Sequence, residues 1–88
     1  MQRDNILDTT KQLISGDRDG QYGSPKKNFE MIAVRWSQIL GADVAPWQVG
    51  LMMADLKMAR LITGGLKEDS FLDLVGYAAI AGELALGE

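Results

Sequence analysis

Two consecutive segments of this 88-residue chain, 46–63 and 69–86, have apolar residues on nearly every side of the helix that each would form. Glycines follow both segments, as expected at helix ends. Asp73 and Glu83 interrupt the second segment, which is also shorter than a membrane span. In a four-helix monomer each helix buries one stripe and exposes the rest to water. The two segments therefore predict a helical domain that forms a homo-oligomer, a dimer or larger.

Two further helices are predicted nearer the N-terminus, at 4–15 and 25–40. Apolar residues recur at helical spacing in both, namely Ile6, Leu7, Leu13 and Ile14 in the first and Phe29, Ile32, Ala33, Trp36 and Leu40 in the second. Ser24 and Pro25 are the N-cap and first-turn residues typical of a helix start. The sequence thus predicts an all-α, four-helix fold with a single domain over residues 1–88.

Composition excludes several kinds of chemistry. The chain has no cysteine and no histidine, which excludes disulfides, thiol nucleophiles and the usual general base and zinc ligand. Its 9 basic and 12 acidic residues give a net charge of −3, which argues against direct DNA binding. Its N-terminus lacks the apolar core of a signal peptide. We expect a soluble, cytoplasmic protein.

The loop 16–24 and the start of the following helix are the first candidate ligand site. Glycine-rich turns and helix N-termini present backbone N–H groups to phosphates. Lys26 could add positive charge, Arg18 a bidentate contact, and Tyr22 a surface for stacking on a base. The alternative interpretation is a plain connection between two helices.

Charged residues on the apolar segments are the second candidate site. Lys57 and Arg60 share a helix face, and a charge on so apolar a helix needs an acidic partner or an anionic ligand. We expect both cations to meet Asp69 or Asp73, as a structural ion-pair network or as a ligand site. Asp69 and Asp73 could also bind magnesium. Alternatively, Ser70 and Asp73 form a helix capping box.

Large apolar residues complete the set of candidates. Met31, Met52, Met53 and Met58 lie at helical spacing and are predicted to fill the core. Trp47, at the start of a predicted helix, either caps the core or anchors an interface. Small residues, Gly76, Ala79 and 82–85, are expected to permit close helix approach.

The order and spacing of motifs resemble a small helical family of unknown function found in tailed phages and prophages. The resemblance rests on Gly16-Asp17-Arg18, Tyr22-Gly23-Ser24-Pro25-Lys26-Lys27-Asn28-Phe29, Trp36, Leu51-Met52-Met53, Leu56-Lys57-Met58-Ala59-Arg60-Leu61, Asp69 and Asp73-Leu74-Val75-Gly76-Tyr77-Ala78-Ala79. More distantly, these motifs are similar to a phage domain associated with nucleotide modification, which resembles MazG-like nucleotide pyrophosphohydrolases. The resemblance implies a MazG-like helical bundle and, for a phage-encoded protein, a location in the host cytoplasm.

MazG-like enzymes hold magnesium with two pairs of acidic residues, and this chain lacks the first pair. The resemblance therefore implies binding of a nucleotide or other phosphorylated small molecule, with no catalytic or metal-ligating residue assigned. The alternative is a protein interaction module directed at a host or defence protein. A third hypothesis is a reduced pyrophosphohydrolase that uses Asp55, Asp69 and Asp73 with magnesium, the one cofactor considered. Enzymatic activity stays open, and a binding protein is favoured.

Overall fold

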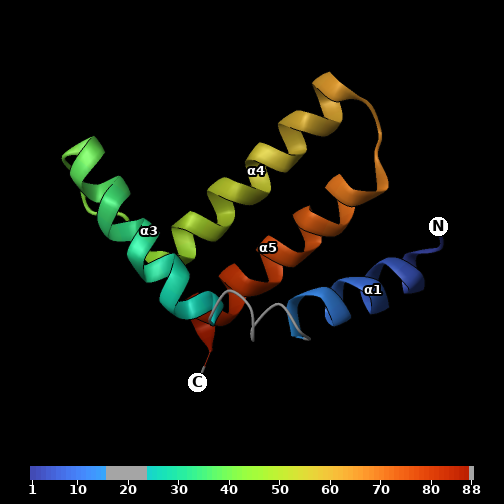
Figure 1. Ribbon diagram of the computed structural model, residues 1–88, viewed down its shortest axis with the longest axis horizontal. Helices are drawn as coiled ribbons and strands as arrows, with labels where there is room; N and C mark the ends of the chain where they lie inside the picture. Colours follow the sequence, from blue (N-terminus) through green and yellow to red (C-terminus); the bar gives the residue numbers. More distant parts are fainter. Residues whose placement is uncertain (16–23, 88) are drawn as a thin grey trace.

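The computed structural model describes residues 1–15 and 24–87, and their regular structure is helical (Figure 1). The helices are α1 (Arg3–Ser15), α3 (Pro25–Leu40), α4 (Pro46–Gly64) and α5 (Glu68–Leu86). No strand occurs within the described residues, so the all-α prediction is confirmed for them. The predicted bounds of each helix differ from the observed bounds by no more than a residue at either end.

Local capping explains where α3 begins and ends. The hydroxyl oxygen of Ser24 accepts a hydrogen bond from the Lys27 backbone N–H at 3.3 Å, and Pro25 occupies the first helical turn. Gly41 closes the helix with a φ of 66°, and its N–H donates to the Ser37 carbonyl at 2.9 Å. A residue with a side chain is strained at such a φ, so the glycine is suited to this helix end.

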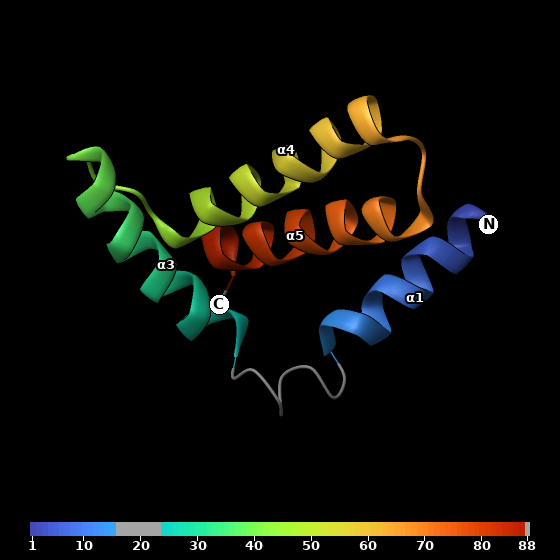
Figure 2. The same cartoon turned by 45° about the horizontal axis from the view of Figure 1, so that its top comes forward.

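Helices α4 and α5 form an antiparallel hairpin in which they lie side by side (Figures 1 and 2). They pack tightly at Gly50, where an added Cβ would lie only 2.7 Å from the Cβ of Ala81. Both residues are buried, as is the neighbouring Val49. The hairpin is therefore held by small residues that let the two backbones pack tightly.

Helices α1 and α3 both pack against the hairpin (Figure 2). At Gly76 of α5 an added Cβ would lie 3.2 Å from Cγ2 of Ile14 in α1. The Phe29 ring of α3 stacks on Tyr77 of α5, with ring centroids 6.2 Å apart and planes at 27°. Around Phe29 and Val49 lies a core that includes Ala33, Ile32, Trp36, Val44, Met53, Tyr77, Ile80 and Leu84.

The outward side of α4 is not covered by the other described helices. Met31, Met52 and Met58 are exposed, so the prediction that the methionines fill the core is wrong for these three; Met53 packs against the core. On α4 the buried positions that pack against α5 are small, Gly50 and Ala54, and Met52 and Met58 lie outside that contact. Met31 belongs to α3 and is two residues from both Phe29 and Ala33, so it points away from the side of α3 that they bury. None of the described helices combines the length and apolar character needed to cross a bilayer.

Candidate functional site

A partly buried ion pair joins α4 to α5. Lys57 Nζ lies 3.2 Å from Asp73 Oδ2, and the two side chains are 15% and 31% exposed. Lys57 follows Gly50 by seven residues, which is two helical turns, so both residues face α5. The pair compensates the lost hydration of a cation on an apolar helix. The prediction that Lys57 meets Asp73 is confirmed, within one chain.

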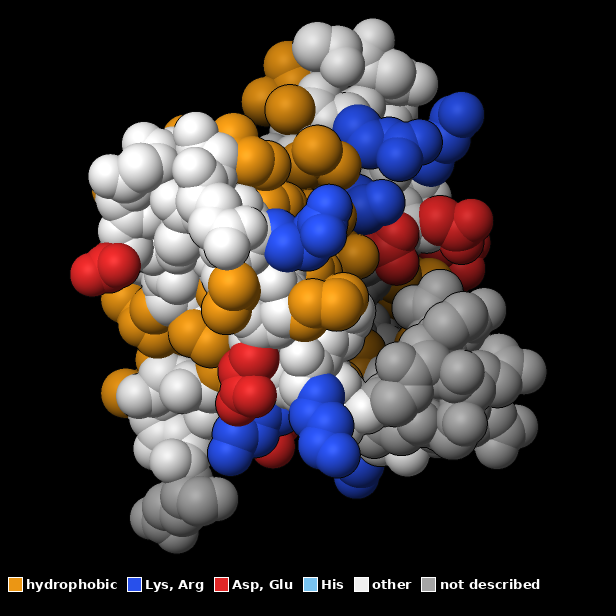
Figure 3. Space-filling model, turned by 60° about the vertical axis from the view of Figure 1, so that its left-hand side comes forward, with side chains coloured by type: hydrophobic (Ala, Val, Ile, Leu, Met, Phe, Trp, Pro, Cys, Tyr) orange, Lys and Arg blue, Asp and Glu red, His pale blue; other side chains and the backbone are white. Residues whose placement is uncertain are grey.

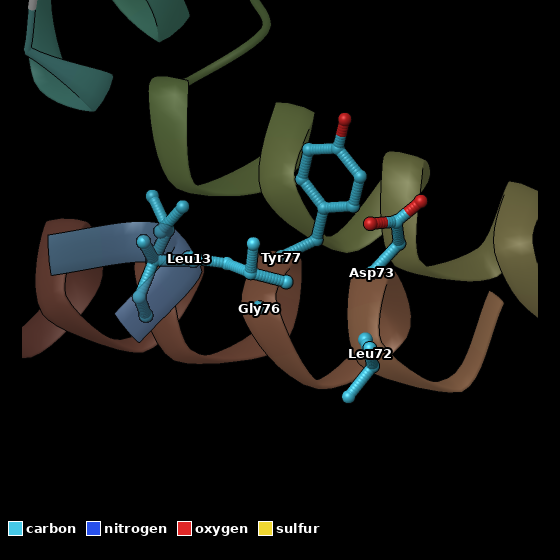
Figure 4. A pocket seen from close by; sticks show the side chains of 7 residues that line it. Leu13, Leu72, Asp73, Gly76 and Tyr77 are labelled. Atoms are coloured by element: carbon cyan, nitrogen blue, oxygen red, sulfur yellow. The ribbon is translucent and has the colours of Figure 1, made fainter. Parts of the chain in front are cut away.

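Lys57 and Arg60 of α4 and Asp73 and Tyr77 of α5 are together called the polar cluster below. Asp73 and Tyr77 are one helical turn apart on α5, and both line a cavity of about 60 Å³ together with Leu13 and Ile14 of α1. Figure 4 shows the Asp73 carboxylate and the Tyr77 hydroxyl projecting to the same side of α5, towards α4. A ligand pocket for a small molecule usually measures about 300–1,000 Å³. This cavity is too small to enclose a nucleotide.

Arg60, the second cation of the predicted network, does not take part in this ion pair. It follows Lys57 by three residues and so lies on the same side of α4, but its side chain is exposed. Within the described residues the Lys57–Asp73 contact is the one ion pair found, so Arg60 has no carboxylate partner there. Asp69 is exposed in the first turn of α5 and is also unpaired among those residues. Within the described residues, the predicted network is therefore the single Lys57–Asp73 pair, next to the exposed guanidinium group of Arg60.

The capping-box interpretation of Ser70 and Asp73 is wrong. Helix α5 begins at Glu68, and its N-cap, Lys67, makes no side-chain capping bond. Ser70 is therefore inside the first turn, where it is buried, and Asp73 points to Lys57. The helix therefore begins without a side-chain cap.

The described part of the chain brings no three acidic side chains together in a way that could hold a metal ion. Asp55 is exposed on α4 and Asp69 on α5, whereas Asp73 is engaged by Lys57. The three carboxylates named for magnesium therefore do not form one site within these residues.

The N-terminal loop site is only partly described. Arg18 and Tyr22 lie outside the described residues. Lys26 is exposed in the first turn of α3, and Phe29, one turn later, contacts Tyr77. The start of α3 therefore lies next to the α5 residues of the polar cluster. Figure 3 shows Lys and Arg side chains in separate groups on one face of the molecule, with hydrophobic side chains and Asp and Glu side chains between them.

Sequence reasoning did not assign Tyr77 to the site, although a signal for it was present. Asp73 and Tyr77 are spaced i, i+4, which places them on one side of a helix. Its ring partner, Phe29, lies 48 positions earlier in the chain, and no local pattern could have paired the two.

A second, apolar feature lies between α3 and α4. Trp36, Ile39, Leu40 and Met52 line a hollow of about 250 Å³. An adjoining hollow of about 360 Å³ is lined by Leu40, Met52, Leu51 and Trp47, among others. Trp47 is 38% exposed, so it forms part of this surface rather than of the closed core.

Comparison with known proteins relates this geometry to a family. The model of a domain of unknown function, DUF6378, matches residues 5–85. The chain is 36% identical over 85 residues to the Gene 55 protein of Mycobacterium phage L5, which covers 96% of this chain and 54% of that protein. It is 37% identical over 75 residues to the Gene 55 protein of Mycobacterium phage D29, covering 85% of this chain and 50% of that protein.

The chain thus spans about half the length of these curated phage relatives. No solved structure matches it significantly. The family match extends over all four described helices and over the polar cluster built from Lys57, Arg60, Asp73 and Tyr77. The chain belongs to the DUF6378 family, a family of unknown function with relatives in mycobacteriophages.

Proposed function

We propose that this protein binds a nucleotide or another phosphorylated small molecule on the face that carries Lys57 and Arg60. The observation that carries the proposal is the exposed Arg60 guanidinium one turn from the sheltered Lys57–Asp73 pair. A phosphate would meet Arg60 at the surface, where bidentate charge-assisted hydrogen bonds are possible.

Asp73 has a positioning role in this proposal. Its carboxylate holds Lys57 Nζ at 3.2 Å, which fixes a second positive group close to Arg60 on the same side of α4. A bound phosphate would share Lys57 with Asp73, so the cation would not need to be ordered on binding. Ordering of a long side chain costs about 0.5–1.5 kcal/mol, which this arrangement avoids.

The class of ligand is supported by two further features. The motifs around Lys57, Arg60 and Asp73 resemble a nucleotide-modification domain and, through it, MazG-like proteins. Within the cluster Tyr77 offers an aromatic ring, and Lys26, one turn before Phe29, the ring partner of Tyr77, offers another cation. Because the cavity at Asp73 measures only about 60 Å³, the ligand is proposed to lie on the surface rather than between the helices.

Titration calorimetry with nucleoside mono- and triphosphates tests this proposal. We expect Arg60→Ala to weaken binding at least about 10-fold, since a hydrogen bond to a charged group contributes about 1.5–3 kcal/mol. Arg35→Ala is the matched control, because Arg35 is an exposed arginine on α3. Equal weakening by both substitutions would indicate non-specific attraction, and no binding at millimolar nucleotide would refute the proposal. Mass spectrometry of small molecules released on denaturation would identify a co-purified ligand.

A protein interaction module directed at a host or defence protein is the second candidate. It is favoured by the apolar hollows between α3 and α4, where Leu40, Met52 and Trp47 are exposed. Leu40→Glu should abolish capture of a partner from host cells while leaving nucleotide binding unchanged. Purified components must then reproduce the interaction; an equal yield with Leu40→Glu would exclude this surface.

A further inference from the structure

The α4/α5 hairpin has one covered side and one uncovered side. Gly50 and Lys57 of α4 face α5, since Gly50 meets Ala81 and Lys57 binds Asp73. We call a residue inward when it faces the other helix of the hairpin. The residue that directly precedes an inward residue lies on the covered side: Val49 precedes Gly50 and lies in the core, and Gly76 precedes Tyr77 and contacts α1.

The residue that directly follows an inward residue lies on the uncovered side, because an α-helix rotates by about 100° per residue. Because α4 and α5 are antiparallel, this rotation brings both sets of residues to the same side of the hairpin. We define the outer hairpin face by six such residues, Leu51, Met58 and Ile62 of α4 and Phe71, Ala78 and Ala85 of α5. All six are exposed, Ile62 to 80%.

We propose that a second copy of this chain covers the outer hairpin face, so that two hairpins pack face to face as a four-helix dimer. None of the six residues is charged; Asp55, which follows the buried Ala54, also lies on this side of α4, whereas Arg60, which precedes the buried Leu61, lies on the opposite side from this face. Exposed apolar patches of this extent usually mark an interface.

The size of the face supports a dimer. Each helix has 19 residues and is therefore about 28 Å long. Two adjacent helices of about 10 Å diameter present a face about 20 Å wide, so each copy would cover roughly 550 Å² and the dimer about 1,100 Å². A specific interface is expected to exceed about 1,000 Å².

The distribution of side-chain size on the face points to a second copy rather than to an unrelated partner. On α5 the end near the α4–α5 turn carries Phe71, whereas the opposite end carries Ala85. If a two-fold axis runs across the helices near Ala78, the bulky end of one α5 lies over the small end of the partner's α5. Phe71 then meets the partner subunit's Ala85, and Ala78 meets its own counterpart near the axis.

Analytical ultracentrifugation tests this arrangement. Wild type should sediment as a dimer, and Phe71→Glu and Ala78→Glu should each raise the dimer Kd at least about 100-fold, because burying an unpaired charge is costly. Val34→Glu is the matched control, since Val34 is an exposed apolar residue of α3. Unchanged helical circular dichroism shows that each variant still folds.

Disulfide trapping tests the two-fold axis directly, because the chain has no cysteine. Ala78→Cys should form a covalent dimer under mild oxidation, and Val34→Cys should not. A monomeric wild type at 100 µM, a dimer insensitive to both glutamate variants, or no cross-link through Ala78→Cys would each overturn the proposal. Nucleotide binding through Arg60 is measured separately, so failure of the dimer and failure of the proposed function are distinguishable.

Discussion

At the scale of single residues, Lys57 links stability to the proposed site. Asp73→Ala would leave its ammonium group partly buried without a carboxylate, and we expect a loss of about 1–3 kcal/mol in the free energy of unfolding. A fully buried pair costs about 3–5 kcal/mol to break, and the smaller value follows from the 31% exposure of Asp73. Urea denaturation measures the effect. Asp69→Ala is the control, since Asp69 is exposed, and it should change stability by less than about 0.5 kcal/mol; equal losses would mean that the pair does not stabilise the fold.

Arg60 should behave in the opposite way. Its side chain is exposed and has no ion-pair partner among the described residues, so Arg60→Ala should leave the free energy of unfolding within about 0.5 kcal/mol of wild type. A sharp loss of stability would show that Arg60 is structural, and the proposed phosphate contact would then have to be abandoned. Thermal melts with and without nucleotide make both measurements in one experiment.

Thr10 offers an independent test of packing in α1. Its side chain is 3% exposed, and its hydroxyl has no hydrogen-bond partner among the described residues. Thr10→Val keeps the shape and removes the unsatisfied group, so we expect a gain of about 1 kcal/mol in stability. In the control, Thr63→Val, the lost hydroxyl donates to the Ala59 carbonyl at 2.9 Å at an exposed site. Thr63→Val should therefore not raise the free energy of unfolding. An equal rise for both variants would show that valine stabilises these helices for reasons unrelated to the buried hydroxyl.

At the scale of helices, Gly50 determines how closely α4 and α5 pack. Gly50→Ala would place a Cβ 2.7 Å from the Cβ of Ala81 and 3.2 Å from the Tyr77 carbonyl oxygen. Because the backbone of α5 must move to accommodate it, we expect a loss of about 1–3 kcal/mol in thermal or urea unfolding. Gly64→Ala, where no atom lies within 4 Å, should be neutral or stabilising. A neutral Gly50→Ala would show that the hairpin is loosely packed.

Helix ends were predictable where their signals are local. Ser24, Pro25 and Gly41 carry capping chemistry in their own side chains or backbone, and α3 begins and ends where they predict. The start of α5 has no such signal, because Lys67 caps nothing with its side chain, and the structure shifts Ser70 into the helix. The role of Gly50 was missed for a related reason, since its neighbour Ala81 is 31 positions away.

At the scale of the whole molecule, the sequence predicted which helices are apolar but not which of their sides are covered. Lys57 and Asp73 were paired correctly because a charge on an apolar helix needs a partner wherever the helix lies. The methionines of α4 obey no such constraint: Met53 packs on the core and Met52 is exposed, although the two are adjacent. Only the placement of α3 on one side of the hairpin decides between them.

The same arrangement predicts the order in which the helices open. Helix α5 is packed against α4 along its length and is also covered by α1, whereas α1 buries only Thr10 fully and rests on α5 alone among its main contacts. Local opening follows the burial that each element loses. We therefore expect amide hydrogen exchange to be fastest in α1 and slowest in the middle of α4 and α5, around Ala54 and Tyr77.

Mass-spectrometric hydrogen exchange at two protein concentrations would separate this order from self-association. Dilution below the dimer Kd should speed exchange mainly in α4 and α5, whose outer face the second copy is proposed to cover, and should leave α1 unchanged. Exchange that is slowest in α1 would contradict the arrangement in Figure 2, because a helix with one neighbour cannot be more protected than the hairpin on which it rests.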